Sequence, residues 1–425
     1  MRSGRWSFVG LLLVTATAGY LCRVNFSTAG VLVMREFGLT QVQMGRIFSA
    51  FLLGYALCQI PAGMLADRWG ARRVLAIASW WWLIGTVAQA CVGWGPWQVD
   101  AGGALWSFMA LRLLLGVTEA PTYPASAQGV ASWIPTRHQG RANGVVLASI
   151  GLGSALAPPL VSASMLRWGW RTAMLISALP ALAAGSVWLL VRENVASRPI
   201  RTVSHPAARS LDRNLRSPAF VLLTASYTLQ GYVGYIFVFW FYLYLVQERH
   251  FDLLQGAFMS SLPWILSLVS IPLGGLLSDR LIAGRLGMIW GRRAVPMFGL
   301  AGAGVLLAFG AQVDNAYAAA VCMALATGLV LSVEGPFWAT MMEMSGSNSG
   351  TAGGIMNMGS NVGGFISPAL TPVLATQIGW NRALLVAATL SVVAAVMWLG
   401  ISPACRSSAE GAAKESCGQA PHSCD

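Results

Sequence analysis

Apolar runs of roughly 20 residues or more recur along the whole chain, separated by short stretches rich in charged residues, glycine or proline. A run of that length crosses the hydrocarbon core of a bilayer as an α-helix. The runs are continuous and not alternating, which favours helices over the strands of a membrane barrel. The pattern predicts twelve membrane-spanning helices, at approximately residues 7–33, 44–66, 72–93, 103–128, 140–165, 171–191, 218–246, 255–279, 294–313, 316–341, 350–376 and 380–402.

The twelve predicted helices fall into two sets of six. The longest polar connection follows the sixth helix, at residues 192–217, and contains six arginines and two prolines. We therefore predict an N-terminal six-helix bundle at 1–191, a cytoplasmic linker at 192–217 and a C-terminal six-helix bundle at 218–402. The remaining residues, 403–425, are rich in Ala, Ser and Gly with nothing to bury, and we expect a disordered cytoplasmic tail.

The composition agrees with a protein that lies mostly in lipid. Hydrophobic residues make up 56% of the 425 residues and charged residues only 10%, against about 25% charged in soluble domains. These values exclude an ordinary soluble enzyme. The seven cysteines lie in apolar runs or in the tail without metal-ligand spacing, so we expect no metal site.

The net charge of +12 points to membrane topology and not to a nucleic-acid partner. Of the 27 basic residues, 26 are arginines, which occur singly or in pairs between the apolar runs. Nineteen basic residues lie at the N-terminus, in every second loop or in the tail, against six in the opposite loops. Because cytoplasmic loops carry the excess of positive charge, we expect a multi-pass protein of the cytoplasmic (inner) membrane with both termini cytoplasmic.

A short motif repeats in the two halves. Gly63-Met-Leu-Ala-Asp67-Arg68 follows the second predicted helix and continues to Arg72-Arg73, while Gly275-Leu-Leu-Ser-Asp279-Arg280 follows the eighth and is succeeded by Gly291-Arg-Arg. In both copies glycine and aspartate are four residues apart. The repetition indicates an internal duplication, as in transporters whose substrate site lies between two repeats.

This repeated motif resembles the cytoplasmic loop signature of the major facilitator superfamily. The resemblance implies an all-α membrane protein with twelve helices in two pseudo-symmetric six-helix bundles. Further segments resemble the anion:cation symporter family, whose members include proton symporters of sugar acids such as galactonate, glucarate and hexuronate. These segments are Tyr20–Ala29, Arg112–Gly116, Glu119-Ala120, Tyr123-Pro124 and, as a weaker match, Gly335–Ala339.

One position departs from that family. Bacterial sugar-acid members commonly carry an aspartate immediately before the first-helix arginine, and the resemblance implicates it in proton coupling. Here that position is Cys22. The substitution removes one expected proton site, which leaves transport in place but bears on its stoichiometry and substrate.

Charged residues inside the predicted helices are the main functional candidates, since each costs on the order of 2.5–3.5 kcal/mol at the bilayer centre. The clear cases are Arg23, Arg112, Glu119 and Glu334. The planar guanidinium of Arg23 suits a substrate carboxylate. Arg112 and Glu119 are seven residues apart on one helix face and, with Glu334, are candidates for proton coupling. For Arg112 and Glu119 the alternative is a charge pair that only joins helices.

Weaker candidates surround this set. Residues predicted to contact the substrate besides Arg23 are Tyr20, Tyr55, Tyr232, Trp338 and Asn361. For the aromatic residues the alternative is packing against neighbours or lipid. Residues predicted to form a cytoplasmic latch that opens and closes during transport are Asp67, Arg68, Arg72, Asp279 and Arg280. The alternative for the arginines is a role in topology alone.

The sequence therefore favours a proton-coupled symporter that imports an organic acid anion, with a sugar acid expected, the proton as coupling ion and no other cofactor. We expect it to act as a monomer. An exporter or antiporter of the same superfamily remains the alternative. A membrane-embedded enzyme is less well supported, because no helix carries a nucleophile–base pair or metal-ligand spacing.

Overall fold

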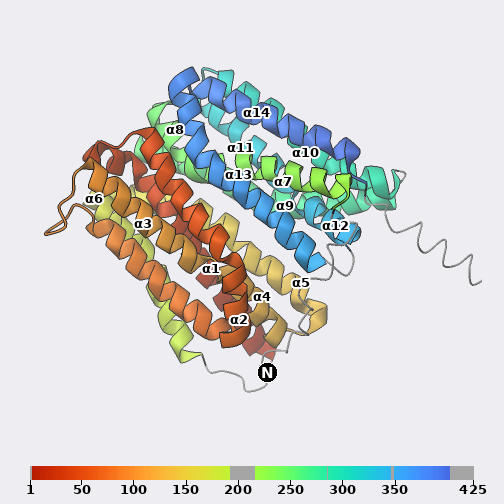
Figure 1. The fold of residues 1–425 in the computed structure, drawn as a ribbon, viewed down its shortest axis with the longest axis horizontal. Helices are drawn as coiled ribbons and strands as arrows, with labels where there is room; N and C mark the ends of the chain where they lie inside the picture. Colours follow the sequence, from red (N-terminus) through yellow and green to blue (C-terminus); the bar gives the residue numbers. More distant parts are fainter. Residues whose placement is uncertain (1, 192–215, 285, 346–348, 403–425) are drawn as a thin grey trace, which may run out of the picture.

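The computed structural model describes residues 2–191, 216–284, 286–345 and 349–402, and within them it contains helices and no strand (Figure 1). Almost all of the predicted linker, and the whole predicted tail, lie outside these residues. The first half contains α1 Arg2–Phe37, α2 Gln41–Cys91, α3 Ala101–Glu119, α4 Thr122–Trp133, α5 Thr136–Leu147 and α6 Ser149–Leu190. The second half contains α7 Pro218–Phe239, α8 Phe241–Gln247, α9 Leu253–Ala283, α10 Gly287–Gln312, α11 Ala316–Ser332, α12 Glu334–Ser345, α13 Ser349–Ile378, α14 Trp380–Met397 and the 3₁₀ turn η3 Trp398–Gly400.

Every predicted span is helical. Nine helical stretches in the described residues are long and apolar enough to cross a membrane. Two of them, α2 and α6, turn sharply at Gly70 and Gly169, both with a φ of +79°. Only glycine adopts that conformation without strain, so each long element supplies two of the predicted spans. The remaining predicted span is α13, a helix of 30 residues that is not among these nine.

Four predicted spans are divided into two helices, where the sequence pattern indicated one. The divided spans are α3–α4, α5–α6, α7–α8 and α11–α12. Two of these breaks have a local cause. Pro121, after α3, and Pro336, after the start of α12, have no N–H, so the helical hydrogen-bond ladder is interrupted beside them. Glu119 ends α3 and Glu334 begins α12, so each of these acids lies at a helix break.

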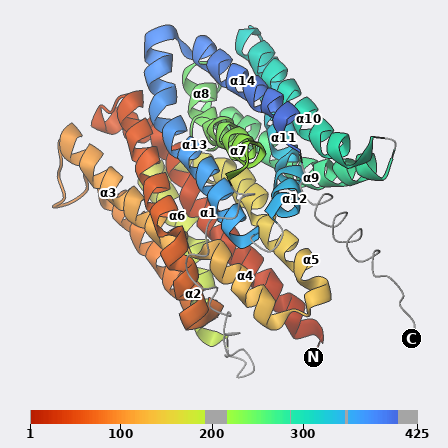
Figure 2. The same ribbon diagram turned by 45° about the vertical axis from the view of Figure 1, so that its right-hand side comes forward.

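The two halves pack against each other through a few helices. In the first half α1 lies along α6 and α2 along α3, while in the second half α13 lies along α7 and α10 along α14 (Figure 2). Between the halves, α2 packs on α13, α6 on α9, and α1 on α7 and α8. Gly45 makes the α2–α13 contact close, because a Cβ atom there would overlap the carbonyl oxygen of Pro368.

The halves are joined at one end of the bundle and less so at the other. We call the end where α1 begins and α14 finishes the terminal end. Hydrogen bonds between the halves join Gln41 to Gln247 at the opposite end and Gln59 to Asn357 in the middle. At the terminal end α4 and α5 pack mainly on α1, α2 and α6, and α12 packs mainly on helices of its own half. The halves therefore pack together more closely at the opposite end than at the terminal end.

Candidate functional site

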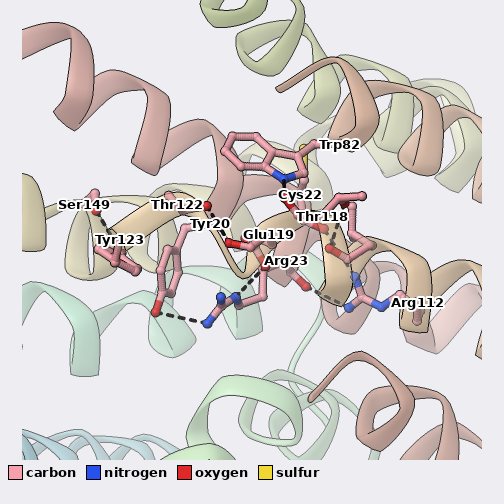
Figure 3. A network of polar contacts seen from close by, with 11 residues as sticks. Tyr20, Cys22, Arg23, Trp82, Arg112, Thr118, Glu119, Thr122, Tyr123 and Ser149 are labelled. Carbon is pink, nitrogen blue, oxygen red and sulfur yellow. Dashed lines mark hydrogen bonds and ion pairs between the residues drawn. The ribbon is translucent and has the colours of Figure 1, made fainter. Parts of the chain in front are cut away.

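Arg23 lies at the centre of the first half, on the middle turns of α1 (Figure 3). Its Nε atom donates to Oε2 of Glu119 at 3.0 Å, and its Nη1 atom donates to the hydroxyl of Tyr20 at 3.2 Å. No hydrogen bond from its Nη2 atom to any described residue is present. The guanidinium thus keeps donor capacity for a further oxygen ligand.

Aromatic rings surround the Arg23 guanidinium. Its central carbon lies 4.4 Å from the ring centroid of Tyr20, 4.7 Å from Tyr55 and 5.0 Å from Phe51. At these distances each ring face attracts the cation, and together the rings exclude water from it. Tyr20 and Tyr55 were predicted from the sequence as substrate contacts, and the structure brings both to Arg23.

Glu119 is held between α1 and the second part of α2. A Cβ atom on Gly19 would lie 3.3 Å from Oε1 of Glu119, so α1 passes very close to this carboxyl. The indole of Trp82 covers the same place and donates to the carbonyl of Thr118 at 3.1 Å. Both members of the Arg23–Glu119 pair have side chains only 3% exposed. The pair is a buried ion pair that links α1 to α3.

Arg112 faces the same helix but binds its backbone. Its Nη1 atom donates to the carbonyl oxygen of Cys22 at 3.3 Å, and its Nη2 atom donates to that of Arg23 at 2.8 Å. The predicted shared face is present, since Arg112 and Glu119 both meet α1 next to Arg23. Arg112 makes no hydrogen bond with Glu119, so the charge pair considered from the sequence forms between Glu119 and Arg23. The geometry of Arg112 is that of a clamp on α1.

Glu334 occupies a separate polar cluster in the second half. Its Oε2 atom accepts from the hydroxyl of Tyr227 at 2.8 Å, and its Oε1 atom accepts from Nε2 of Gln230 at 2.9 Å. Both donors belong to α7. Trp338, one turn further along α12, is 36% exposed. This acid has hydrogen-bond donors around it but no ion-pair partner among the described residues.

A residue that the sequence did not single out connects the two halves beside these clusters. Oε1 of Gln59, one turn after Tyr55 on α2, accepts from Nδ2 of Asn357 at 3.1 Å and of Asn361 at 3.3 Å. Gln59 is four residues after Tyr55 and therefore lies on the same helix face. This spacing could have identified Gln59 as a candidate from the sequence. The hydroxyl of Tyr232, in contrast, bonds that of Thr371 at 3.1 Å inside the second half.

The predicted latch residues lie at the terminal end. Asp67 and Arg68 are exposed and Arg72 donates to the carbonyls of Trp188 and Leu189 within its own half. In the second half Asp279 accepts from Arg292 at 2.7 Å, and the same arginine bonds Glu343 at 2.6 Å. Arg280 is exposed. These bonds of Arg72 and of Asp279 each lie within one half.

Two bundles with duplicated turns, broken helices and a buried ion pair at the centre define a class of protein, the secondary transporters that work by alternating access. The family model described as Major Facilitator Superfamily matches residues 11–283 and 280–421. The chain belongs to this superfamily, and the predicted fold class is confirmed. It is a multi-pass membrane transporter and not an enzyme.

Relatives of similar length support the same family. The chain is 29% identical to a "Probable sulfoacetate transporter SauU" of Cupriavidus necator, over 94% of each chain. It is 27% identical to a "Probable galactarate/D-glucarate transporter GudP" of Bacillus subtilis, over 93% of this chain and 91% of that protein. It is 26% identical to a "Hexuronate transporter" of the same organism, over 91% and 92%.

Solved structures share the fold. A bacterial homolog of the human lysosomal transporter Spinster aligns with a TM-score of 0.77 and 16% identity, over 93% of this chain and 96% of that one. A D-xylose-proton symporter aligns with a TM-score of 0.74 and 16% identity, over 92% and 97%. At such identities the likeness describes the fold alone.

Proposed function

We propose that this transporter imports an organic acid anion together with protons, and that the anion is a sugar acid. The observation that carries the proposal is the buried guanidinium of Arg23, which has an unused donor and is framed by Tyr20, Tyr55 and Phe51. Relatives named as transporters of glucarate, galactarate and hexuronate support the substrate class.

The ion pair supplies a coupling mechanism. Ionised Glu119 accepts from Arg23 and neutralises it. Protonation of Glu119 removes the negative charge and frees the guanidinium for a substrate carboxylate. Proton and anion then each favour the binding of the other, as reciprocal linkage requires. Arg112 supports the pair by holding the backbone of α1, and Glu334 is the next candidate for the proton if Glu119 is not the carrier.

Alternating access is supported by the looser packing of the two halves at the terminal end. With both termini cytoplasmic, as the distribution of basic residues favours, this end faces the cytoplasm and we propose that the protein lies in the cytoplasmic membrane. Closure would bring Asp67 and Arg68 towards the second half, near Asp279 and Arg280, which we propose as the latch. The working unit is proposed to be a monomer of the two bundles that lie at 1–191 and 218–402, with the proton as the coupling ion and no metal or organic cofactor.

Uptake into proteoliposomes tests the proposal. A panel of labelled galactonate, gluconate, glucuronate, glucarate and aromatic acids is offered with and without an inward proton gradient. Accumulation of a sugar acid that depends on the gradient supports the proposal. Transport of uncharged sugars in preference to acids contradicts anion recognition. Efflux driven by proton entry contradicts symport and supports the exporter or antiporter alternative.

A further inference from the structure

Among the described residues, Glu334 differs from two other acids of the helices, Glu119 and Glu343, because it bonds no cationic side chain. Glu119 bonds Arg23 at 3.0 Å and Glu343 bonds Arg292 at 2.6 Å. Glu334 is held instead by two neutral donors, the Tyr227 hydroxyl and the Gln230 amide. Gln230 also bonds the carbonyl of Val330 at 3.3 Å, which fixes the amide in turn. The carboxyl is therefore fixed in direction, and each oxygen keeps a lone pair for another donor.

Glu334 is related to Arg23 through α7, the helix that carries its two hydrogen-bond donors. Ser27, one turn after Arg23 on α1, donates to the carbonyl oxygen of Val238 at 3.4 Å. Tyr235 is about one turn before Val238 on α7, so it lies near the level of Arg23. The eight residues from Tyr227 to Tyr235 rise about 12 Å along the helix. A six-carbon acid in extended form, with a hydrogen bond of about 3 Å at each end, has a comparable length. Gln59 bonds Asn361 of α13. The adjoining part of α13 passes close to this stretch of α7, because a Cβ atom on Gly363 would overlap the carbonyl oxygen of Thr228.

We propose that Glu334 determines which acids are transported, by binding the end of the substrate that is remote from Arg23. This inference rests on the proposed function. The Glu334 carboxylate accepts hydrogen bonds, so it suits a far end that carries hydroxyl groups. A second carboxylate there meets a like charge held in place by Tyr227 and Gln230, and no cation among the described residues bonds Glu334 to offset the repulsion. The site selects monoanionic polyhydroxy acids over diacids of the same length.

The wild-type protein provides the first test at neutral pH. Galactonate and galactarate share one carbon skeleton and differ only at the far end, which is an alcohol in the first and a carboxylate in the second. Gluconate and glucarate form a second such pair. We expect counterflow of the monoanion to exceed that of its diacid at least tenfold in any pair that is transported. Equal exchange, or a preference for the diacid, overturns the inference and leaves the proposed function standing. Exchange of none of the four acids contradicts both.

Variants then assign the selectivity to Glu334. Glu334→Gln keeps the hydrogen-bonding shape but removes the charge, and should reduce the preference for the monoanion at least tenfold. Glu334→Asp keeps the charge and should retain the preference, as should Tyr227→Phe, which removes one hydroxyl without changing charge. An unaltered ratio of monoanion to diacid counterflow in Glu334→Gln overturns the inference. If Glu334→Gln does not fold, Glu334→Ala is measured instead and should lose the preference for the monoanion. The ratio of monoanion to diacid counterflow in the wild-type protein tests the inference independently of either variant.

Discussion

The Nε atom of Arg23 and the Oε2 atom of Glu119 are 3.0 Å apart, although 95 residues separate these two side chains in the sequence. The bond crosses from α1 to α3 in the centre of the first half. A carboxylate in this position competes with any substrate carboxylate for the same guanidinium. The Glu119 carboxylate is thus both the partner of Arg23 in the absence of substrate and the group that a substrate must displace.

Replacement of Arg23 should remove substrate binding. Charge-assisted hydrogen bonds contribute about 1.5–3 kcal/mol each, so loss of two corresponds to a roughly 100-fold or greater fall in affinity. Arg23→Ala is expected to show this fall in affinity. Arg23→Lys should restore the affinity only in part, because an ammonium has no planar fork. Binding is measured by thermal-shift titration with the transported acid. The exposed Arg167 supplies the control Arg167→Ala, and normal binding by Arg23→Ala would refute anion recognition at this residue.

Much of the fold could be predicted from the sequence, because membrane helices must be long, apolar and continuous. The central pair could be predicted only in part. Arg23 and Glu119 were chosen for the cost of a charge in lipid, and the structure joins them. The partner of Arg112 could not be read in the same way, since spacing within one helix does not show which atoms of a neighbouring helix lie opposite. Gln59 was missed because an amide carries no charge to mark it.

Arg112 is expected to contribute to stability more than to proton coupling, because its donors meet the carbonyls of Cys22 and Arg23. Arg112→Leu should lower the midpoint of thermal unfolding and reduce counterflow and proton-driven uptake to the same extent. Arg112→Lys should recover part of both, since an ammonium still reaches one carbonyl. Both activities are measured in the same liposomes, and a loss confined to proton-driven uptake would assign Arg112 to coupling instead.

Closure of the opposite end depends on Gly45. A Cβ atom on Gly45 would overlap the Pro368 carbonyl and lie 2.9 Å from Cγ of Pro372, so Gly45→Val should keep the two halves apart there. The native side chains of Gln41 and Gln247 are 3.1 Å apart at their ends. Cysteines introduced by Gln41→Cys and Gln247→Cys should therefore be joined by a short thiol-specific bifunctional cross-linker in the parent protein and much less in Gly45→Val. Exchange should fall at least tenfold. Gly10→Val is the matched control, because no atom lies within 4 Å of its Cβ position; equal cross-linking in both variants would contradict the assignment.

Cys22 provides a test of stoichiometry. It is buried, 1% exposed, and its carbonyl accepts from Arg112. A carboxylate introduced here lies near that cation and can carry a proton. We expect the parent protein to move one proton per substrate and Cys22→Asp to move one more, with Cys22→Ser as the uncharged control. Reversal potentials in liposomes give the ratio. Two protons in the parent protein would show that Glu334 or another acid already acts beside Glu119.

Glu119 is expected to be the coupling residue. Burial favours its neutral form and Arg23 favours its ionised form, so changes around the pair during transport can drive protonation and release. Glu119→Gln is a permanent analogue of the protonated acid, and its amide oxygen can still accept from Arg23. It should therefore bind anion and perform counterflow but lose uptake driven by a pH gradient.

The decisive comparison measures counterflow and gradient-driven uptake in the same Glu119→Gln liposomes. Glu248→Gln, at an exposed acid in the connection after α8, is the control and should keep both activities. Substrate added to the parent protein in weak buffer should also take protons from solution, because anion binding to Arg23 displaces and protonates Glu119. If both activities survive in Glu119→Gln, or if substrate causes no proton uptake, Glu119 only holds Arg23 in place and the coupling proton binds elsewhere.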